Sequence, residues 1–538
     1  VTTDPTPIQP HDLAPLATTI RGDDPIVLEA DVVVVGSGAG GGVVAADLAR
    51  AGRSVVVLEA GPFVPEKDMP QDELAAFDRL YLNHGLNVSW DASILTLVGG
   101  AVGGGTVVNW LTCVAPPEAV RHGWATRHGV AGFDGPGVDA DIEAIERELG
   151  VREPPNVPPK DQLIIRGATV LGHEVGETRR NGVDCGDCGR CGFGCRRGAK
   201  QSGLRTHLAE AWRHGARIVP DAPVERVIVE DGTATGVEAS VELDGRPRRL
   251  VVRAPAVVVA AGTLRTPVVL LRSGVGHPAM GRHLRLHPVS ILAAFLDEDV
   301  TMWRGTTQAA RTLEHLADGA DADGGGFIVE SAPGTPGLIG LVFPWDGRAA
   351  FRALMGEIGH VAPLLAITAD RVGGRVGISR TGRPRIDYTV ATEDRRALQE
   401  GLATCARIAW EGGSRRMLAV GTPPAWFSST RGSGDAAAFA AYEARLRDFD
   451  FRPNRGTVAS AHQMGSARAG GAAGDYPCDP WGRVRTAGAR SRRDATIPGL
   501  YVGDASLFPT AVGVNPMITT MVWARRVART VLAESPSG

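Results

Sequence analysis

A run of valines that leads into a glycine-rich turn constrains the fold of this chain more than any other feature. Val32–Val35 are four consecutive β-branched residues, which suit a strand buried on both faces. Gly36, Gly38 and Gly41 follow in the spacing G-x-G-x-x-G, and residues 43–50 have a helical pattern. Glycines permit the tight turn and let a phosphate approach the N-terminus of the helix. The pattern predicts a strand–turn–helix unit that binds a dinucleotide.

An acidic residue closes the next stretch of the same unit. Val55–Leu58 has the pattern of a second buried strand, and Glu59 follows it, 23 residues after Gly36. An acid at this distance typically accepts hydrogen bonds from the ribose of a bound dinucleotide. No second complete fingerprint occurs in the sequence, and a fingerprint near the start of the chain is typical of flavoproteins. We therefore expect FAD as the cofactor, in preference to NAD.

The remaining patterns predict two domains, one of them discontinuous. The chain has 538 residues, which is too long for one simple domain. We expect an α/β (α+β overall) fold with a Rossmann-like FAD-binding domain over residues 25–284. A substrate domain built on an antiparallel sheet is expected over 285–455, after which residues 456–538 return to the first domain.

Individual elements are expected in both domains. In the first, helices are expected near residues 138–149 and 202–213. In the substrate domain, the expected strands include residues 289–295 and 337–343, and a helix is expected over 392–411.

Composition excludes several classes of protein. Lysine and arginine total 57 against 60 aspartates and glutamates, so the net charge of −3 gives no electrostatic basis for binding nucleic acid. No apolar run approaches the roughly 20 residues of a transmembrane helix, so none is expected. The segment Val1–Asp24 lacks a basic start and an apolar core, which argues against a secretory signal. The expected location is cytoplasmic.

Four of the seven cysteines lie in one glycine-rich loop, residues 182–198. Cys185, Cys188, Cys191 and Cys195 have the spacing C-x2-C-x2-C-x3-C of bacterial iron–sulfur proteins. We expect these four residues to hold an iron–sulfur cluster, of the 4Fe-4S or a related type. Arg196 stands where the bacterial run has proline, so zinc, free thiols and local disulfides remain alternatives. Zinc is less favoured because it usually takes two separated pairs of ligands, and disulfides because they are rare in a reducing cytoplasm.

Five ordered segments give the chain a resemblance to a known family. They are residues 36–41 with 59–61, GGAVGGGTVVNW at 99–110, AAGTLRTP at 260–267 with LLRSGVG at 270–276, SAHQMGS at 460–466, and LYVGDAS at 500–506 with GVNPM at 513–517. Together they resemble the glucose–methanol–choline oxidoreductases, and within them the long-chain fatty alcohol oxidase branch. The middle domain matches little beyond length, so the resemblance leaves the substrate open.

The resemblance implies a role for each matching position around FAD. The implied contacts on the ADP side are Gly36, Gly38, Gly41 and Glu59, with Val224 at the adenine. The implied contacts along the flavin and phosphates are Gly103, Gly104, Thr106, Asn109, Gly262, Asp504, Ala505, Pro516 and Met517. Proline also suits the first position of a helix, whose free N–H groups would favour an anionic flavin. In the cysteine loop the relatives keep positions matching Cys188, Cys191 and Cys195, so Cys185 is additional.

The resemblance also implies a catalytic pair. His462 would be the base that takes the hydroxyl proton of an alcohol, and Asn515, which cannot exchange a proton, would orient the substrate oxygen. His287 matches another family segment, and we expect it to be structural or to line the pocket.

The expected reaction is oxidation of an alcohol to an aldehyde or ketone, with hydride transfer to FAD. Electrons would pass through the cluster to an acceptor protein or quinone. Direct reaction with oxygen, without a cluster, is the alternative. A flavin-containing lyase and a light-driven decarboxylase are the competing classes, and the presence of His462 and Asn515 favours oxidation over both.

Overall fold

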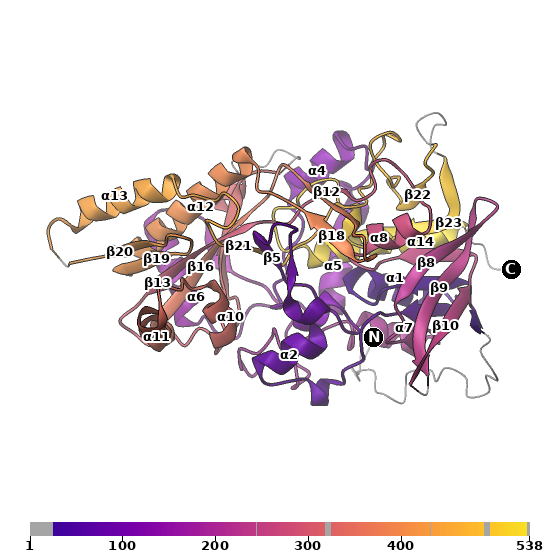
Figure 1. Ribbon diagram of the computed structural model, residues 1–538, viewed down its shortest axis with the longest axis horizontal. Coiled ribbons are helices and arrows are strands. Elements are labelled where there is room, and N and C mark those ends of the chain that lie inside the picture. The colour runs from indigo at the N-terminus through magenta and orange to yellow at the C-terminus, as the bar shows by residue number, and fades with distance from the viewer. Residues whose placement is uncertain (1–24, 244, 318–323, 431, 489–494, 535–538) are drawn as a thin grey trace.

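The computed structural model describes residues 25–243, 245–317, 324–430, 432–488 and 495–534. The segment Val1–Asp24, in which we expect no secretory signal, lies outside these residues. In Figure 1 one end of the molecule carries the strands of the dinucleotide unit, and the other end carries a large mixed sheet with long helices. Among the described helices, none is long and apolar enough to cross a membrane. The expected compartment remains a prediction.

The dinucleotide unit is built on a six-stranded sheet in the order β22-β23-β11-β2-β3-β7. All neighbours pair in parallel except β22 and β23, which are antiparallel. Its strands are β2 (Val32–Val35), β3 (Val55–Leu58), β7 (Arg217–Val219), β11 (Ala256–Val259), β22 (Arg483–Arg485) and β23 (Thr496–Val502). Strands from both ends of the chain therefore share this sheet.

Helices and a smaller sheet pack against these strands. Helix α1 (Ala39–Arg50) contacts α7 (His207–Arg213) and α14 (Met517–Glu534), and α14 also contacts α5 (Pro136–Glu148). A four-stranded sheet in the order β1-β10-β9-β8 packs through β9 on β11 and β23. Its strands are β1 (Ile26–Glu29), β8 (Val224–Glu230), β9 (Thr233–Leu243) and β10 (Arg246–Arg253). The valines of β2 are at most 4% exposed, which is why this strand has no polar positions.

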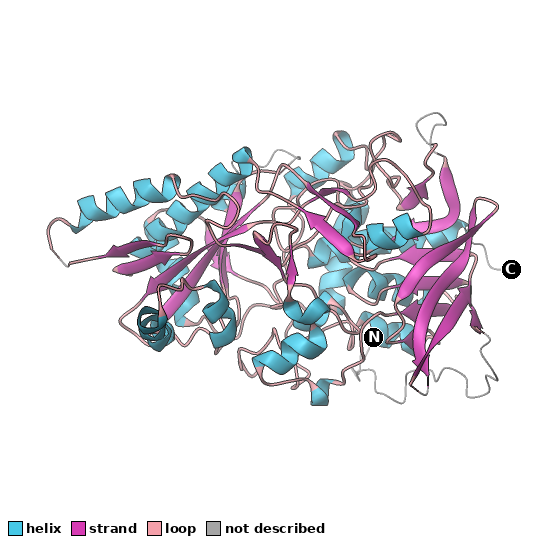
Figure 2. Cartoon of the chain, in the orientation of Figure 1, coloured by secondary structure: helices cyan, strands magenta, loops and turns pink. Residues whose placement is uncertain are grey.

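The second large sheet has the path β4-β5-β21-β13-β16-β15-β14-β6, with β19 and β20 branching from β13. Every pair in it is antiparallel except β5 and β21. The strands are β4 (Asn87–Val88), β5 (Ile94–Thr96), β6 (Val175–Glu177), β13 (Val289–Phe295), β14 (Ala310–Thr312), β15 (Phe327–Ser331), β16 (Val361–Thr368), β19 (Arg416–Ala419), β20 (Ala425–Ser428) and β21 (Val458–Ser460). This sheet confirms the predicted antiparallel architecture, and Figure 2 shows its strands with helices around them.

Helix α12 (Thr392–Glu411) packs on β13 and β16 and contacts α6 (Pro159–Val170) and α13 (Asp435–Arg447). A small antiparallel sheet, β12-β17-β18, accompanies them. Further elements are α2 (Glu73–Leu80), α3 (Gly105–Val108), α4 (Glu118–Thr126), α8 (Thr266–Arg272), α9 (Glu314–Ala317), α11 (Arg348–Gly356), β12 (Arg282–Leu284), β17 (Gly374–Ile378) and β18 (Pro384–Asp387).

One expected strand is a helix. Residues 337–343 were predicted to be extended, but α10 (Pro336–Val342) occupies them. Proline suits the first helical position, and the Glu73 carboxylate accepts hydrogen bonds from the amides of Gly337 (2.8 Å) and Leu338 (2.7 Å). The prediction was wrong because this cap comes from a residue far away in the sequence. A smaller difference concerns α7, which begins at His207, whereas the helix was expected to begin near residue 202.

Candidate active site

The glycine turn after β2 is shaped by backbone that approaches from other segments. A Cβ at Gly36 would lie 2.3 Å from the carbonyl oxygen of Ala260, and one at Gly41 would lie 1.9 Å from that of Gly36. Gly36 also has φ of 99°, which disfavours other residues. Gly38 differs, because no atom lies within 4 Å of the Cβ position. Gly36 and Gly41 therefore permit close packing of the chain, whereas Gly38 leaves space for a ligand.

A cavity of about 820 Å³ begins at this turn and extends to the second large sheet. It brings together predicted residues from the beginning, middle and end of the chain. Those that line it are Gly36, Gly38, Glu59, Gly104, Thr106, Asn109, Val224, Gly262, His462, Asp504, Ala505, Asn515, Pro516 and Met517. Gly41 and Gly103 do not line it, and the four cysteines of the loop do not either.

Glu59 and Ser37 tie the turn to the loop that contains Gly103. The carboxylate of Glu59 accepts hydrogen bonds from the amide (2.9 Å) and hydroxyl (2.6 Å) of Ser37, and from the amide of Gly61 (3.0 Å). The Ser37 oxygen in turn accepts from the amide of Gly103 (2.9 Å). Gly103 therefore supports the cavity wall from behind, and Glu59 lies at its edge.

Asp504 and Thr106 are held by several hydrogen bonds each. One carboxylate oxygen of Asp504 accepts from the amide of Gly262 (2.9 Å) and the hydroxyl of Thr266 (2.6 Å), and burial raises the pKa of Asp504. The Thr106 hydroxyl donates to the carbonyl of Gly103 (2.6 Å) and accepts from the amide of Gly203 (2.9 Å). These contacts make the walls around the predicted cofactor site rigid.

The start of α14 differs slightly from the prediction. Helix α14 begins at Met517, and the carbonyl of Pro516 accepts the first helical hydrogen bond, from the amide of Thr520 (2.8 Å). Pro516 is therefore the residue before the helix, one position earlier than predicted. The side-chain amide of Asn109 lies 3.1 Å from the sulfur of Met517, so the glycine loop contacts the helix N-terminus.

His462 lies at the cavity and contacts a second histidine. Its Nδ1 lies 3.3 Å from Nδ1 of His287, which is completely buried. The amide of Gly513 donates to Nε2 of His287 (3.0 Å), so neutral His287 carries its proton on Nδ1. Burial lowers the pKa of His462 to about 4, and burial followed by the nearby His462 lowers that of His287 well below its ordinary value. Both rings are therefore neutral at physiological pH.

Asn515 lies next to a carboxyl group that sequence reasoning missed. Its side-chain nitrogen donates to Oε2 of Glu330 (3.3 Å), which also accepts from the side-chain amide of Gln308 (3.1 Å). Glu330 comes from β15, is completely buried and lines the cavity. Burial is the main reason that its pKa is raised to about 7. The available signal was a charged residue inside an otherwise apolar strand pattern, which usually needs a functional or structural partner.

The side of the cavity toward the second large sheet is mainly apolar. Its walls come from strands of that sheet, from α10 and from the segment after β5. The apolar residues there are Leu95, Leu97, Val98, Val289, Ile291, Leu338, Ile339, Val342, Pro363, Leu365 and Ile367. The polar groups of His462, Asn515 and Glu330 thus occur in a cavity that otherwise suits an apolar body.

The cysteine loop lies beside the site without forming a ligand set. Lys200, which is buried, donates to the carbonyls of Cys191 (2.7 Å) and Asn109 (2.7 Å) and so connects the two loops. Cys188 is exposed and the other three sulfurs are partly buried. Among the residues that the structure describes, which include the whole loop, no three histidine, cysteine or acidic side chains are grouped as a metal requires. The arrangement supports neither an iron–sulfur cluster nor zinc.

Comparison with known proteins agrees with this arrangement. Residues 77–289 and 370–524 match the family described as GMC oxidoreductase. An uncharacterized GMC-type oxidoreductase of Mycobacterium tuberculosis is 34% identical over 98% of this chain and 80% of that protein. A long-chain-alcohol oxidase of Arabidopsis thaliana is 31% identical over 96% of this chain and 69% of its own length.

The fold is also similar to that of a solved structure. Formate oxidase of Aspergillus oryzae superposes with a TM-score of 0.68 at 15% identity, covering 94% of this chain and 98% of that one. The chain belongs to the GMC oxidoreductase family.

Proposed function

We propose that this protein oxidises an alcohol that has a sizeable apolar body, using FAD, with His462 as base and Asn515 orienting the hydroxyl. The observation that carries the proposal is the position of these two residues. Both line the same cavity as the glycine turn and the apolar side chains of the second large sheet.

The residues around the turn fit FAD. The space beside Gly38, the acid Glu59 and the start of α1 suit the ADP part, because a helix N-terminus and glycine amides favour phosphates. The starts of α3 and α14 border the same cavity, where Asn109 and Met517 would contact the flavin ring. FAD, when bound, supplies the acceptor for the hydride.

His462 has the state that a base requires. Its pKa is lowered to about 4 by burial, so the imidazole ring is neutral at neutral pH and has a nitrogen that can accept a proton. The contact with His287 limits which nitrogen can act. Because His287 presents N–H at Nδ1, Nδ1 of His462 accepts in the resting enzyme and its proton is on Nε2. The proposal therefore requires this contact to loosen when the alcohol binds.

Asn515 would hold the alcohol oxygen while His462 takes the proton. One side of its amide is already bonded to Glu330, whereas its oxygen is buried and has no partner among the described residues. A carboxamide nitrogen carries two N–H groups, so the one that does not bond Glu330 would donate to the alcohol oxygen and leave the single hydroxyl proton for His462.

The substrate class follows from the walls and from the relatives. Apolar side chains from β5, β13 and α10 line the substrate side of the cavity. The similar Arabidopsis proteins are named long-chain-alcohol oxidases. We propose a medium-length or long apolar alcohol, including a terpenoid or sterol alcohol.

We further propose that oxygen is the electron acceptor. An iron–sulfur relay would need convergent cysteine sulfurs, and the described loop has no such group. Iron and sulfide analysis of anaerobically purified protein tests this choice. If the protein contains stoichiometric iron and sulfide, and a Cys191→Ser variant loses them, the choice of oxygen is wrong. The result would support an iron–sulfur cluster that passes electrons to an acceptor protein or quinone.

Anaerobic spectroscopy tests the central proposal. FAD-loaded protein is mixed with a primary alkanol, and loss of the visible flavin absorbance, followed by its return with oxygen, is expected. Absence of bleaching with every alcohol tested, together with cleavage of a cyanohydrin, would identify a lyase of the same fold instead.

A further inference from the structure

Glu330 has an oxygen that no protein group satisfies. Its Oε2 accepts from Asn515 and Gln308, but Oε1 is buried and has no partner among the described residues. The side-chain oxygen of Asn515 is in the same situation. A buried acceptor without a partner costs about 1–3 kcal/mol. Glu330 and Asn515 are hydrogen-bonded neighbours and both residues line the cavity, so a bound ligand can supply a missing donor there.

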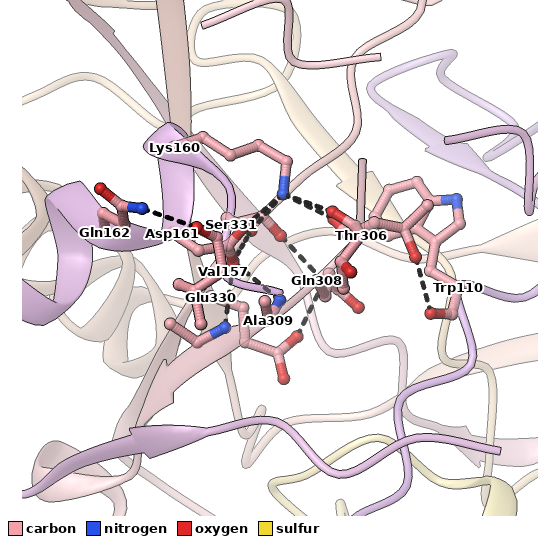
Figure 3. Close-up of polar contacts among 12 residues, drawn as sticks. Trp110, Val157, Lys160, Asp161, Gln162, Thr306, Gln308, Ala309, Glu330 and Ser331 are labelled. Carbon is pink, nitrogen blue, oxygen red and sulfur yellow. Dashed lines mark hydrogen bonds and ion pairs between the residues drawn. The ribbon is translucent and has the colours of Figure 1, made fainter. Parts of the chain in front are cut away.

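Glu330 is held in place from behind, so it cannot turn to find another partner. The Gln308 amide donates also to the carbonyl of Ser331 (2.9 Å), and its oxygen accepts from the hydroxyl of Thr112 (2.6 Å). Gln308 is thus oriented with its nitrogen toward Glu330. Figure 3 shows Gln308 and Glu330 joined by a hydrogen bond.

A buried ion pair supports the same segment. Lys160 and Asp161 are both completely buried and paired, and Lys160 donates to the carbonyls of Thr306 (3.1 Å) and Thr307 (3.0 Å). Asp161 accepts from the amides of Ala309 (2.8 Å) and Ala310 (3.0 Å). Figure 3 shows Lys160 and Asp161 beside Gln308 and the strand that carries Glu330. The polar end of the cavity is therefore preorganised.

Building on the proposed function, we propose that Glu330 recognises a second hydroxyl group of the substrate. An N–H of Asn515 donates to the oxygen of the hydroxyl that is oxidised, whose proton goes to His462, and Oε1 of Glu330 accepts from a hydroxyl on a neighbouring carbon. The preferred substrate is then a diol with an apolar body, and a plain alkanol leaves Oε1 unpaired. The direct hydrogen bond between the two residues keeps both groups at one end of the cavity, as two hydroxyls on neighbouring carbons require.

A comparison of two substrates tests this recognition. A primary alkanol and the terminal vicinal diol of the same chain length are compared by kcat/KM with the FAD-loaded enzyme, at a pH above 7 where Glu330 is ionised. The wild type should favour the diol by about ten- to a hundredfold, as expected for a hydrogen bond to a carboxylate. The difference should lie mainly in KM, since Glu330 binds and does not react.

Variants of Glu330 make the test specific. Glu330→Leu should bring the diol-to-alkanol ratio close to one. Glu330→Gln keeps the size and an oxygen for Asn515 and Gln308, and should lower the ratio several-fold. Glu443→Gln is the matched control, because Glu443 is a buried acid of α13 that pairs with Arg407 and does not line the cavity. Its ratio should equal that of the wild type.

The outcomes separate this proposal from the proposed function. Oxidation of both alcohols at equal efficiency by the wild type would overturn the role of Glu330 and leave alcohol oxidation intact, with water as the partner of Oε1. An unchanged ratio in Glu330→Leu would overturn it as well. If neither alcohol bleaches the flavin, the proposed function itself fails.

Discussion

At the scale of single residues, the site depends on groups whose charge is set by burial. His462 is kept neutral and Glu330 is brought to a pKa of about 7 because desolvation by the surrounding protein disfavours the charged form of each. Asn515 connects the two, since it lines the cavity with His462 and donates to Glu330.

Replacement of His462 is expected to affect chemistry more than cofactor binding. His462→Gln should lower kcat by roughly 10²–10⁴, the usual contribution of a positioned base. The visible flavin spectrum and FAD content should stay as in the wild type. His122→Gln is the control, because His122 is exposed and does not line the cavity. Wild-type turnover in His462→Gln would show that another group is the base.

Glu330 is expected to make stability depend on pH. Its folded pKa is raised from 4.5 to about 7, so the folded state binds the proton more tightly. This stabilisation is complete below pH 4.5 and is lost as pH rises to about 7, by roughly 3 kcal/mol in all. The Tm of the FAD-loaded wild type should therefore fall relative to Glu330→Gln across this window. Parallel pH profiles of the two proteins would contradict the shift.

At the scale of secondary-structure elements, the turn between β2 and α1 combines packing with ligand binding. Gly36 and Gly41 are in close contact with backbone atoms, whereas Gly38 borders open space. Helix α10 shows a different kind of control, since its N-terminus is capped by Glu73 of α2. The elements around the cavity are therefore defined partly by distant partners.

Two alanine substitutions separate packing from binding in the turn. Gly41→Ala should destabilise the fold by about 1–3 kcal/mol, because its Cβ would meet the backbone oxygen of Gly36 at 1.9 Å. Gly38→Ala meets no atom within 4 Å and should leave the apo protein as stable as the wild type, while lowering FAD occupancy. Thermal unfolding of apo protein and flavin content after desalting measure the two effects. Equal FAD content in Gly38→Ala and wild type would show that the phosphates of FAD do not bind beside Gly38.

At the scale of the whole molecule, a buried ion pair connects α6 with the segment before β14 and with β15. Lys160→Met would leave Asp161 charged and unpaired inside the protein, at a cost of roughly 3–5 kcal/mol. Arg226→Met, which removes an exposed partner of Glu238, should cost about 1 kcal/mol or less. Chemical denaturation of both variants measures the difference, and equal stability would show that Lys160 and Asp161 contribute little.

Much of the fold and part of the site could be predicted from local sequence. The strand, turn and helix around Gly36 are determined by contiguous residues, since β-branched residues, glycines and helix formers each restrict their own backbone. The sheet of the second domain was predicted from strand-like runs, of which residues 289–295 form β13 and residues 337–343 proved to be helical. His462 and Asn515 were identified from short motifs, and the structure brings them to one cavity.

Other features depend on which distant segments meet. Glu330 and Asn515 are 185 residues apart, and Glu73 caps a helix that begins more than 250 residues later. The cysteine spacing predicted a metal centre, but the described loop does not bring the sulfurs together. A hydrogen bond, a cap or a ligand set forms between side chains that packing brings within reach, and a pKa shifts with burial. Spacing along the chain specifies none of these, so the tertiary structure is needed to find them.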